Sequence, residues 1–525
     1  MNLYRAIGSI GGLTMVSRLL GFARDMIGSR VLGASHANDA FNLAFLLPNI
    51  FRRLFAEGAF SSGFVPLFSR RLASGGHKDA EAFSNEILAV FMPALLAVTL
   101  VFVIFMPAVL LLVVPDYQAV PGKFDLAVEL TRWTFPYLLF ISLVALLSGI
   151  LNSLTKFAIA AFAPALLNVA LIVALLVAPT DKVEVVRYMA WAVLVGGVAQ
   201  FLLCWVAVRR AGVKLSFRRP RLTPAVKELV ILVLPATVAA GVYQISQLFY
   251  AYFSSQLGEG ALTKLSYADR LNQLPLSIIG TALGVAILPS ISQAIARNDE
   301  VEAADVQARA FDLSMLLTLP ATLALAVAAG PIIGALYQGG EYSVADATVT
   351  ANILAILVTG LPAYVLVKVL TPAYYARKDV KTPVRIAMSV LGAGIVANFL
   401  LIPWLGIYSL ATVTSASAWV NFGLLFVILH HRDQFRMPRW LVSRVSRQFV
   451  AAAAMAASLY AIKLTLGDLF FGGVLERVAG LGLLVGVGAI VYFSVAWMIG
   501  GMDREAIAAL RRRPKSDPAT TPLGE

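Results

Sequence analysis

The chain has 525 residues, of which 59% are hydrophobic and 14% are charged, and its formal net charge at pH 7 is +13. Uncharged stretches of about 20 residues recur along the chain, and a helix of that length crosses the hydrocarbon core of a membrane. This composition excludes a soluble globular domain and predicts an all-α polytopic membrane protein. The basic residues collect between the apolar stretches, as they do in membrane proteins generally, so the net charge is no sign of a nucleic-acid partner.

The apolar stretches predict about 14 transmembrane helices. The first two, near residues 3–31 and 39–68, contain arginine, and an alanine-rich helix lies near residues 448–462. The other predicted helices lie in residues 87–115, 133–155, 157–180, 188–208, 229–258, 271–296, 313–340, 347–367, 386–431, which is long enough for two helices, and 478–502.

The predicted helices group into two six-helix lobes plus two extra C-terminal helices. The N-terminal lobe covers residues 1–215 and the C-terminal lobe residues 216–435, with the extra pair in residues 436–502. Residues 503–525 are polar and contain proline, which predicts a disordered cytoplasmic tail. Each lobe opens with unusually polar helices, a pattern that points to a binding site between two related halves.

The distribution of lysine and arginine predicts the orientation, because these residues accumulate in cytoplasmic loops. With the N-terminus in the cytoplasm, the basic clusters in residues 209–227, 377–385, 432–447 and 504–515 all fall inside. The opposite loops hold only Lys123, Lys182, Arg187, Lys264, Lys463 and Arg477. Both termini are therefore predicted to be cytoplasmic.

Arginines inside the apolar helices are the main functional signal. An unpaired guanidinium at mid-bilayer costs about 2.5 to 3.5 kcal/mol, so such residues normally face a cavity or a bundle interior. Arginine also grips phosphate and carboxylate groups in two-pronged fashion. The helical repeat places Asp25 and Ser17 on faces shared with the first arginines, and it places Asp39, Asn49, Arg53 and Glu57 on one stripe of the second helix.

We therefore expect an anion-binding cavity between polar helix faces. The candidate substrate-binding residues are Arg18, Arg24, Arg52, Arg270, Ser17, Asn49 and Arg53. The candidate charge partners or gating residues are Asp25, Asp39, Glu57 and Asp269. The acids have an equally plausible structural role, in which they neutralise neighbouring arginines in a salt-bridge network.

Four segments carry a resemblance to a known family. They are SRLLGFARD at residues 17–25, PNIFRRLFAEGAF at 48–60, YADRL followed by LP at 267–275, and TPAYYAR with KTP at 371–383. They resemble the signatures of the MurJ (MviN) family, bacterial lipid II flippases of the multidrug/oligosaccharidyl-lipid/polysaccharide exporter superfamily. The resemblance covers the whole chain. It implies 14 helices, a central cationic cavity, a groove near the last two helices for a polyprenyl tail, and substrate handling by Arg18, Arg24, Arg52 and Arg270.

The resemblance implies a transporter of the bacterial inner membrane rather than an enzyme. Its substrate would be lipid II, whose pyrophosphate and peptide carboxylates cannot cross hydrocarbon unaided. No catalytic residue, metal or cofactor is expected, and the energy would come from the membrane potential or from a sodium or proton gradient. Membrane lipids are expected neighbours, and cell-wall synthesis proteins are possible partners.

Two other functions stay open at this point. One is another exporter of the superfamily, either a polysaccharide-lipid flippase or a cation-drug antiporter. An antiporter for cations is expected to carry acidic residues in its lobes, and residues 229–258 contain none. A polyprenyl-linked glycosyltransferase would place catalytic acids in a sizeable outer loop, and the predicted outer loops are short.

The predicted orientation is testable by cysteine labelling in a background that lacks Cys204. Cysteines that replace Pro121 and Gly339 should react with an impermeant maleimide applied to intact cells, whereas cysteines at Gly76 and Pro220 should not. Labelling of a cysteine at position 220 from outside, together with no labelling at position 121, would contradict the predicted orientation.

Overall fold

The computed structural model describes residues 3–55, 59–216, 219–466 and 472–502. Their regular structure is helical apart from one isolated bridge between Gly339 and Tyr342. This confirms the predicted all-α class. Two compact units make up the chain, one formed by Met1–Leu271, Ile333–Leu357 and Val384–Ser417, and the other by Asn272–Ile332, Val358–Pro383 and Ala418–Glu525.

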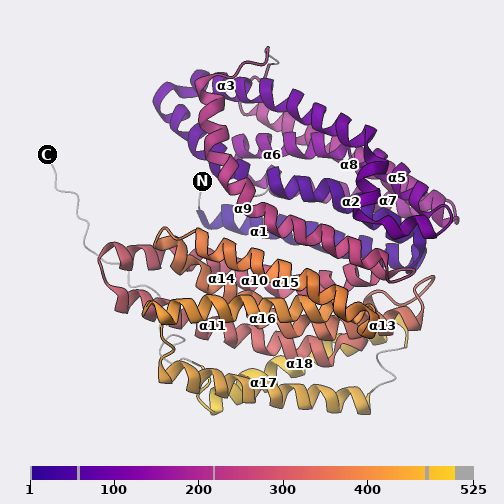
Figure 1. The fold of residues 1–525 in the computed structure, drawn as a ribbon, viewed down its shortest axis with the longest axis vertical. Helices are drawn as coiled ribbons and strands as arrows, with labels where there is room; N and C mark the ends of the chain where they lie inside the picture. The colour runs from indigo at the N-terminus through magenta and orange to yellow at the C-terminus, as the bar shows by residue number, and fades with distance from the viewer. Residues whose placement is uncertain (1–2, 56–58, 217–218, 467–471, 503–525) are drawn as a thin grey trace. The chain divides into compact units, whose positions relative to one another are not determined.

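The first unit holds the N-terminal helices and parts of later ones (Figure 1). The helices that lie wholly in this unit are α1 (Leu3–Leu32), α2 (His36–Phe55), α3 (Ala59–Ile104), α4 (Met106–Val113), η1 (Pro115–Ala119), α5 (Lys123–Thr134), α6 (Tyr137–Ser153), α7 (Phe157–Val177), α8 (Lys182–Arg210), α9 (Pro224–Ser255) and α13 (Val344–Leu357). Four further helices are shared with the second unit. The first unit holds the first residues of α10 (Ala261–Ala296), the end of α12 (Ala329–Leu336), most of α15 (Lys381–Leu405) and the start of α16 (Tyr408–His431).

The second unit contains the rest of these shared helices together with α11 (Glu300–Val327), η2 (Val358–Gly360), α14 (Leu361–Ala376), α17 (Arg439–Thr465) and α18 (Val474–Met498). The boundaries of the two units differ from those of the predicted lobes, because compactness follows contacts between helices rather than their order in the chain. The division at residues 215 and 435 therefore stays a prediction.

Ten helical segments among the described residues are long and apolar enough to cross a membrane. Helices α1, α2, α9 and α10, which correspond to the polar helices expected to open the two lobes, are not in that set. The helices are compatible with a total of 14, and that count remains a prediction.

The second predicted helix, residues 39–68, is wrong in its extent. Helix α2 ends at Phe55, and α3 begins at Ala59 and continues to Ile104 through the charged stretch that was expected to be a loop. Helical structure is interrupted there only at Gly76, whose φ of 69° lies in the left-handed region that favours glycine. Charge alone does not end a helix, since lysine, arginine and glutamate are good helix formers.

Proline within α2 is accommodated by a neighbouring helix. Pro48 has no N–H to donate to the carbonyl of Ala44, four residues earlier. The Thr134 hydroxyl on α5 donates to that carbonyl at 2.7 Å instead. This replacement lets α2 keep its helical course up to the arginine pair at its end.

Aromatic packing forms much of the first unit's interior. Phe60, Phe64 and Phe68 on α3 stack along one face, and Phe64 also stacks on Phe83 with a centroid distance of 5.5 Å. Phe64 is fully buried. Such rings bury large apolar areas at each contact, and the Phe64–Phe83 stack joins the parts of α3 before and after Gly76.

The last two helices are joined to α11 in the second unit by buried polar contacts. On α17, Arg444 Nη1 and Gln448 Nε2 donate to the two oxygens of Asp312 at 2.9 and 2.7 Å, and Tyr492 on α18 donates to the Leu316 carbonyl at 2.7 Å. Helices α17 and α18 also pack side by side, as the yellow end of the chain shows in Figure 1. The lipid-tail groove expected near these helices stays a prediction.

Candidate functional site

A single buried carboxylate joins two of the predicted arginines. Asp25 Oδ1 accepts hydrogen bonds from Arg24 Nη2 at 2.6 Å and Nε at 3.0 Å, and Asp25 Oδ2 accepts one from Arg270 Nε at 2.7 Å. Arg24 and Asp25 lie on α1, whereas Arg270 lies on the first part of α10. One carboxylate therefore accepts hydrogen bonds from two guanidinium groups on different helices.

Asn168 on α7 completes the surroundings of Arg24. Its Oδ1 accepts from Arg24 Nη1 at 3.1 Å, and its Nδ2 donates to the Ser17 carbonyl at 3.1 Å. The Arg24 guanidinium also lies 5.8 Å from the centre of the Phe45 ring, within the range of a cation–π contact. We call Arg24, Asp25, Asn168 and Arg270 the Arg24 cluster.

The two arginines of this cluster differ in exposure. The side chain of Arg24 is 11% exposed, whereas that of Arg270 is 46% exposed. Arg18, two helical turns before Asp25, is also exposed on α1. The cluster thus offers an accessible positive side chain that a buried carboxylate holds in place.

The arginine at the end of α2 is held by its own helix. Asn49 Oδ1 accepts from Arg52 Nε at 3.0 Å, while Asn49 Nδ2 donates to the Phe45 carbonyl at 2.7 Å. In this geometry Asn49, a predicted substrate-binding residue, orients Arg52. Arg53 is half-buried in the last turn of α2, and Glu57 lies outside the described residues.

Asp39, the third predicted acid, belongs to a different cluster. Its Oδ2 accepts from the Gly260 backbone N–H at 2.9 Å and from Lys123 Nζ at 3.0 Å. Its Oδ1 accepts from the backbone N–H and the hydroxyl of Thr263 at 3.0 and 2.8 Å. The carboxylate therefore caps the N-terminus of α10 from another helix. We call Asp39, Lys123, Gly260 and Thr263 the Asp39 cluster.

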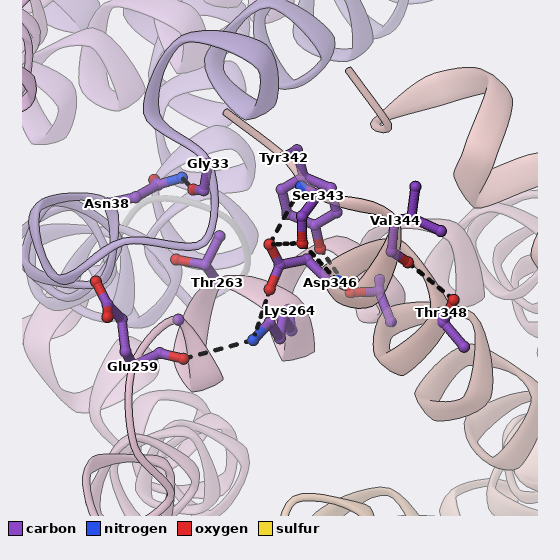
Figure 2. Close-up of polar contacts among 12 residues, drawn as sticks. Gly33, Asn38, Glu259, Thr263, Lys264, Tyr342, Ser343, Val344, Asp346 and Thr348 are labelled. Atoms are coloured by element: carbon purple, nitrogen blue, oxygen red, sulfur yellow. Dashed lines mark hydrogen bonds and ion pairs between the residues drawn. The ribbon is translucent and has the colours of Figure 1, made fainter. Parts of the chain in front are cut away.

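Three chain segments of the first unit meet beside this cluster. They are residues 33–39, 259–264 and 337–346, which we call the three-loop junction. The Lys264 ammonium lies 2.8 Å from Asp346 Oδ1, and Ser343 donates from its hydroxyl to Asp346 Oδ2 at 2.7 Å. Figure 2 shows Lys264 directed towards Asp346 and Ser343 beside the Asp346 carboxylate. Asn38 Nδ2 donates to the Gly33 carbonyl at 2.6 Å on the opposite side of the junction.

The surface of the junction carries a further ion pair. Lys182 Nζ lies 2.6 Å from Glu341 Oε2, and hydrogen bonding to Lys182 holds the pKa of Glu341 below its usual range. The two side chains are 38% and 54% exposed. An ion pair that is this exposed contributes little to stability.

The structure brings together only part of the predicted site. It joins Arg24, Asp25 and Arg270, links Ser17 to them through Asn168, and places Asp39 at a separate cluster. Asp269 is half-buried on α10 next to Arg270 in sequence. Among the described residues, no group of histidine, cysteine, aspartate and glutamate side chains has the arrangement of a metal site.

Sequence reasoning missed four residues that the structure places in these clusters, namely Asn168, Lys123, Gly260 and Thr263. Asn168 is a lone amide in an otherwise apolar helix, and that isolation was the available signal. Lys123 was taken as an outer-loop residue, but it is 4% exposed and paired with Asp39. The signal in that case was indirect, because Asp39 needed a basic partner and no arginine supplies one.

Comparisons with known proteins agree on one family. The family model described as lipid II flippase MurJ matches residues 29–480. The chain is 40% identical to the probable lipid II flippase MurJ of Rhizobium meliloti (strain 1021), over 98% of this chain and 97% of the relative. It is 37% identical to the lipid II flippase MurJ of Burkholderia cenocepacia, over 98% of this chain and 100% of the relative.

Solved structures show the same fold. A lipid II flippase MurJ in an inward closed conformation superposes with a TM-score of 0.76 at 23% identity, covering 96% of this chain and 99% of that chain. An inward-facing multidrug resistance MATE family transporter of the MOP superfamily gives a TM-score of 0.68 at 16% identity, over 81% of this chain and 98% of that one.

The contacts of Asn168 predict a measurable stability difference. Asn168→Leu leaves Arg24 Nη1 without its acceptor, and it should lower the free energy of unfolding in detergent by about 1 to 3 kcal/mol. Asn398→Leu is the matched control, because the Asn398 side chain donates only within α15, to the Gly394 carbonyl, and its buried Oδ1 has no partner among the described residues. Equal losses for the two variants would contradict the role of Asn168.

Proposed function

The chain belongs to the lipid II flippase MurJ family, so it is a lipid II flippase and a multi-pass transporter of the bacterial inner membrane, and we propose that it works by alternating access through a central cationic cavity. In this mechanism the cavity opens first to the cytoplasmic leaflet and then to the periplasmic leaflet. Lipid II is a precursor for peptidoglycan, which places the protein in cell-wall synthesis.

The two guanidinium groups that Asp25 holds together are the observation that carries the proposal. A guanidinium can bind a phosphate group in two-pronged fashion, and Asp25 holds Arg270 by one nitrogen while almost half of that side chain is exposed. Arg18 adds a second exposed guanidinium on the same helix as Arg24. These side chains match the chemistry of an anionic headgroup. Arg52, Arg53 and Asn49 on α2 are proposed to extend the site.

The acids are assigned separate roles in this proposal. Asp25 is a charge partner, because its two oxygens accept from two arginines. Asp39 is a gating residue, because it accepts from α5 and from the start of α10. Asp269 and Glu57 stay candidates for either role.

We further propose that both termini are cytoplasmic. The basic clusters support this orientation, because they all fall on one side of the predicted helices. Contact with cell-wall synthesis proteins stays a prediction.

Charge removal tests the cavity. Arg18→Ala, Arg24→Ala, Arg52→Ala and Arg270→Ala should each reduce transport of fluorescent lipid II by purified protein in vesicles by about tenfold or more, since each removes a charged donor. The corresponding lysine variants should recover part of the rate, because lysine keeps the charge but loses the fork geometry.

The matched control is Arg309→Ala, which removes an arginine that is 75% exposed and whose ion pair in the described part of the chain is with Asp305 of the same helix. Its transport should equal that of the parent protein. Full transport by the Arg24→Ala and Arg270→Ala variants, at normal abundance, would contradict the proposal of a cationic substrate cavity.

The energy source is proposed to be the membrane potential. Moving one negative charge outward across an inside-negative membrane releases about 2.3 kcal/mol per 100 mV, and the returning arginines are drawn inward by the same field. Collapse of the potential with valinomycin and potassium should therefore stop transport while sodium and proton gradients are held. Undiminished transport at zero potential would instead assign the energy to one of those gradients.

A further inference from the structure

The four hydrogen bonds of the Asp39 cluster come from two different sources. Three donors belong to residues 260–263, at the start of α10. The fourth is Lys123 Nζ, from the first residue of α5. Separation of α10 from α2 would remove the first three donors together and leave the fourth.

Lys123 belongs to α5, the helix that packs on α2, so it would remain beside Asp39 if α10 moved away. Helix α5 packs along α2, and Thr134 at the other end of α5 donates to the Ala44 carbonyl of α2. The Lys123 ammonium also lies 4.0 Å from the centre of the Tyr117 ring. The side chains of Lys123 and Asp39 are 3% and 1% exposed, so each charge has the other as its counterion in a place with little water.

We propose that Lys123 is the positioning residue of the closure at the three-loop junction: it holds the Asp39 carboxylate towards the start of α10, so that the contact can break and form again in each cycle. This inference rests on the proposed alternating access, which requires the junction to open. Lys123 keeps Asp39 paired when the donors of α10 depart, and it returns the carboxylate to them on closing.

The pairing has a consequence that a simple packing role lacks. Removal of either partner leaves the other as an unpaired buried charge, whereas removal of both leaves none. The closed junction should therefore be weakened by either single neutral substitution and partly restored when the two are combined. A lysine that served only to fill space would give defects that add.

The closed state is measured by a cross-link that does not depend on transport. His36 Nε2 lies 3.5 Å from Glu259 Oε2 across the junction, so cysteines at these two positions report its closure. In a background without Cys204, a short bis-maleimide should join the two cysteines of His36→Cys/Glu259→Cys in membranes in high yield, because the parent side chains meet there. Adding Lys123→Met should lower that yield several-fold, and Lys123→Arg should lower it less.

The deciding variant is the combination of Lys123→Met with Asp39→Asn, in which the cross-link yield should recover part of the loss and exceed that of either single variant, because the asparagine at position 39 keeps one acceptor for α10 and no buried charge is left unpaired. Lys182→Met is the matched control, because it removes a lysine from the exposed pair with Glu341 at the same junction, and its yield should not change. An unchanged yield in Lys123→Met, or a double variant as weak as the worse single one, would overturn the proposal. Because the cross-link reports closure alone, loss of the arginine-cavity function would leave this result intact.

Discussion

Hydrocarbon offers no hydrogen-bond partner to a charge, so each charged group within a membrane protein must find one in the protein or in a water-filled cavity. The first unit meets this constraint by sharing carboxylates. Asp25 accepts from two arginines, and Asp39 accepts from a lysine and from the start of a helix. Both acids thereby join N-terminal helices to α10. The positions of Arg24 and Arg270 depend on Asp25, and the start of α10 depends on Asp39.

The fold of the family does not by itself determine the substrate. The chain shares its fold with a MATE family transporter at a TM-score of 0.68, and that likeness concerns architecture alone. The charges on the helices carry the chemical information. In this chain Asp25 accepts from two guanidinium groups, and the proposed anion cavity rests on that arrangement. The side chains of the site, rather than the shared fold, are therefore what a test of the substrate must change.

The sequence was sufficient for the class of fold and for the arginine-bearing helices, because composition and charge spacing are local properties. Helical periodicity placed Asp25 on one face with Arg18, whereas its hydrogen-bond partners are the adjacent Arg24 and the distant Arg270. It could not show that Arg270, 245 positions later, reaches the same carboxylate, because periodicity describes one helix and not its neighbours. The burial of Lys123 could not be predicted for a related reason. The sequence around a lysine just before an apolar stretch is the same whether its side chain faces water or a buried acid.

The three-loop junction also has a steric property that follows from its glycines. A Cβ on Gly260 would collide with the Ala34 carbonyl, and one on Gly340 would collide with the Arg30 carbonyl, so main chain meets main chain at both places. Both glycines have positive φ, which other residues rarely adopt. A side chain at either position would hold the two main chains apart. The close fit of this junction is therefore set by residues that carry no chemical group of their own.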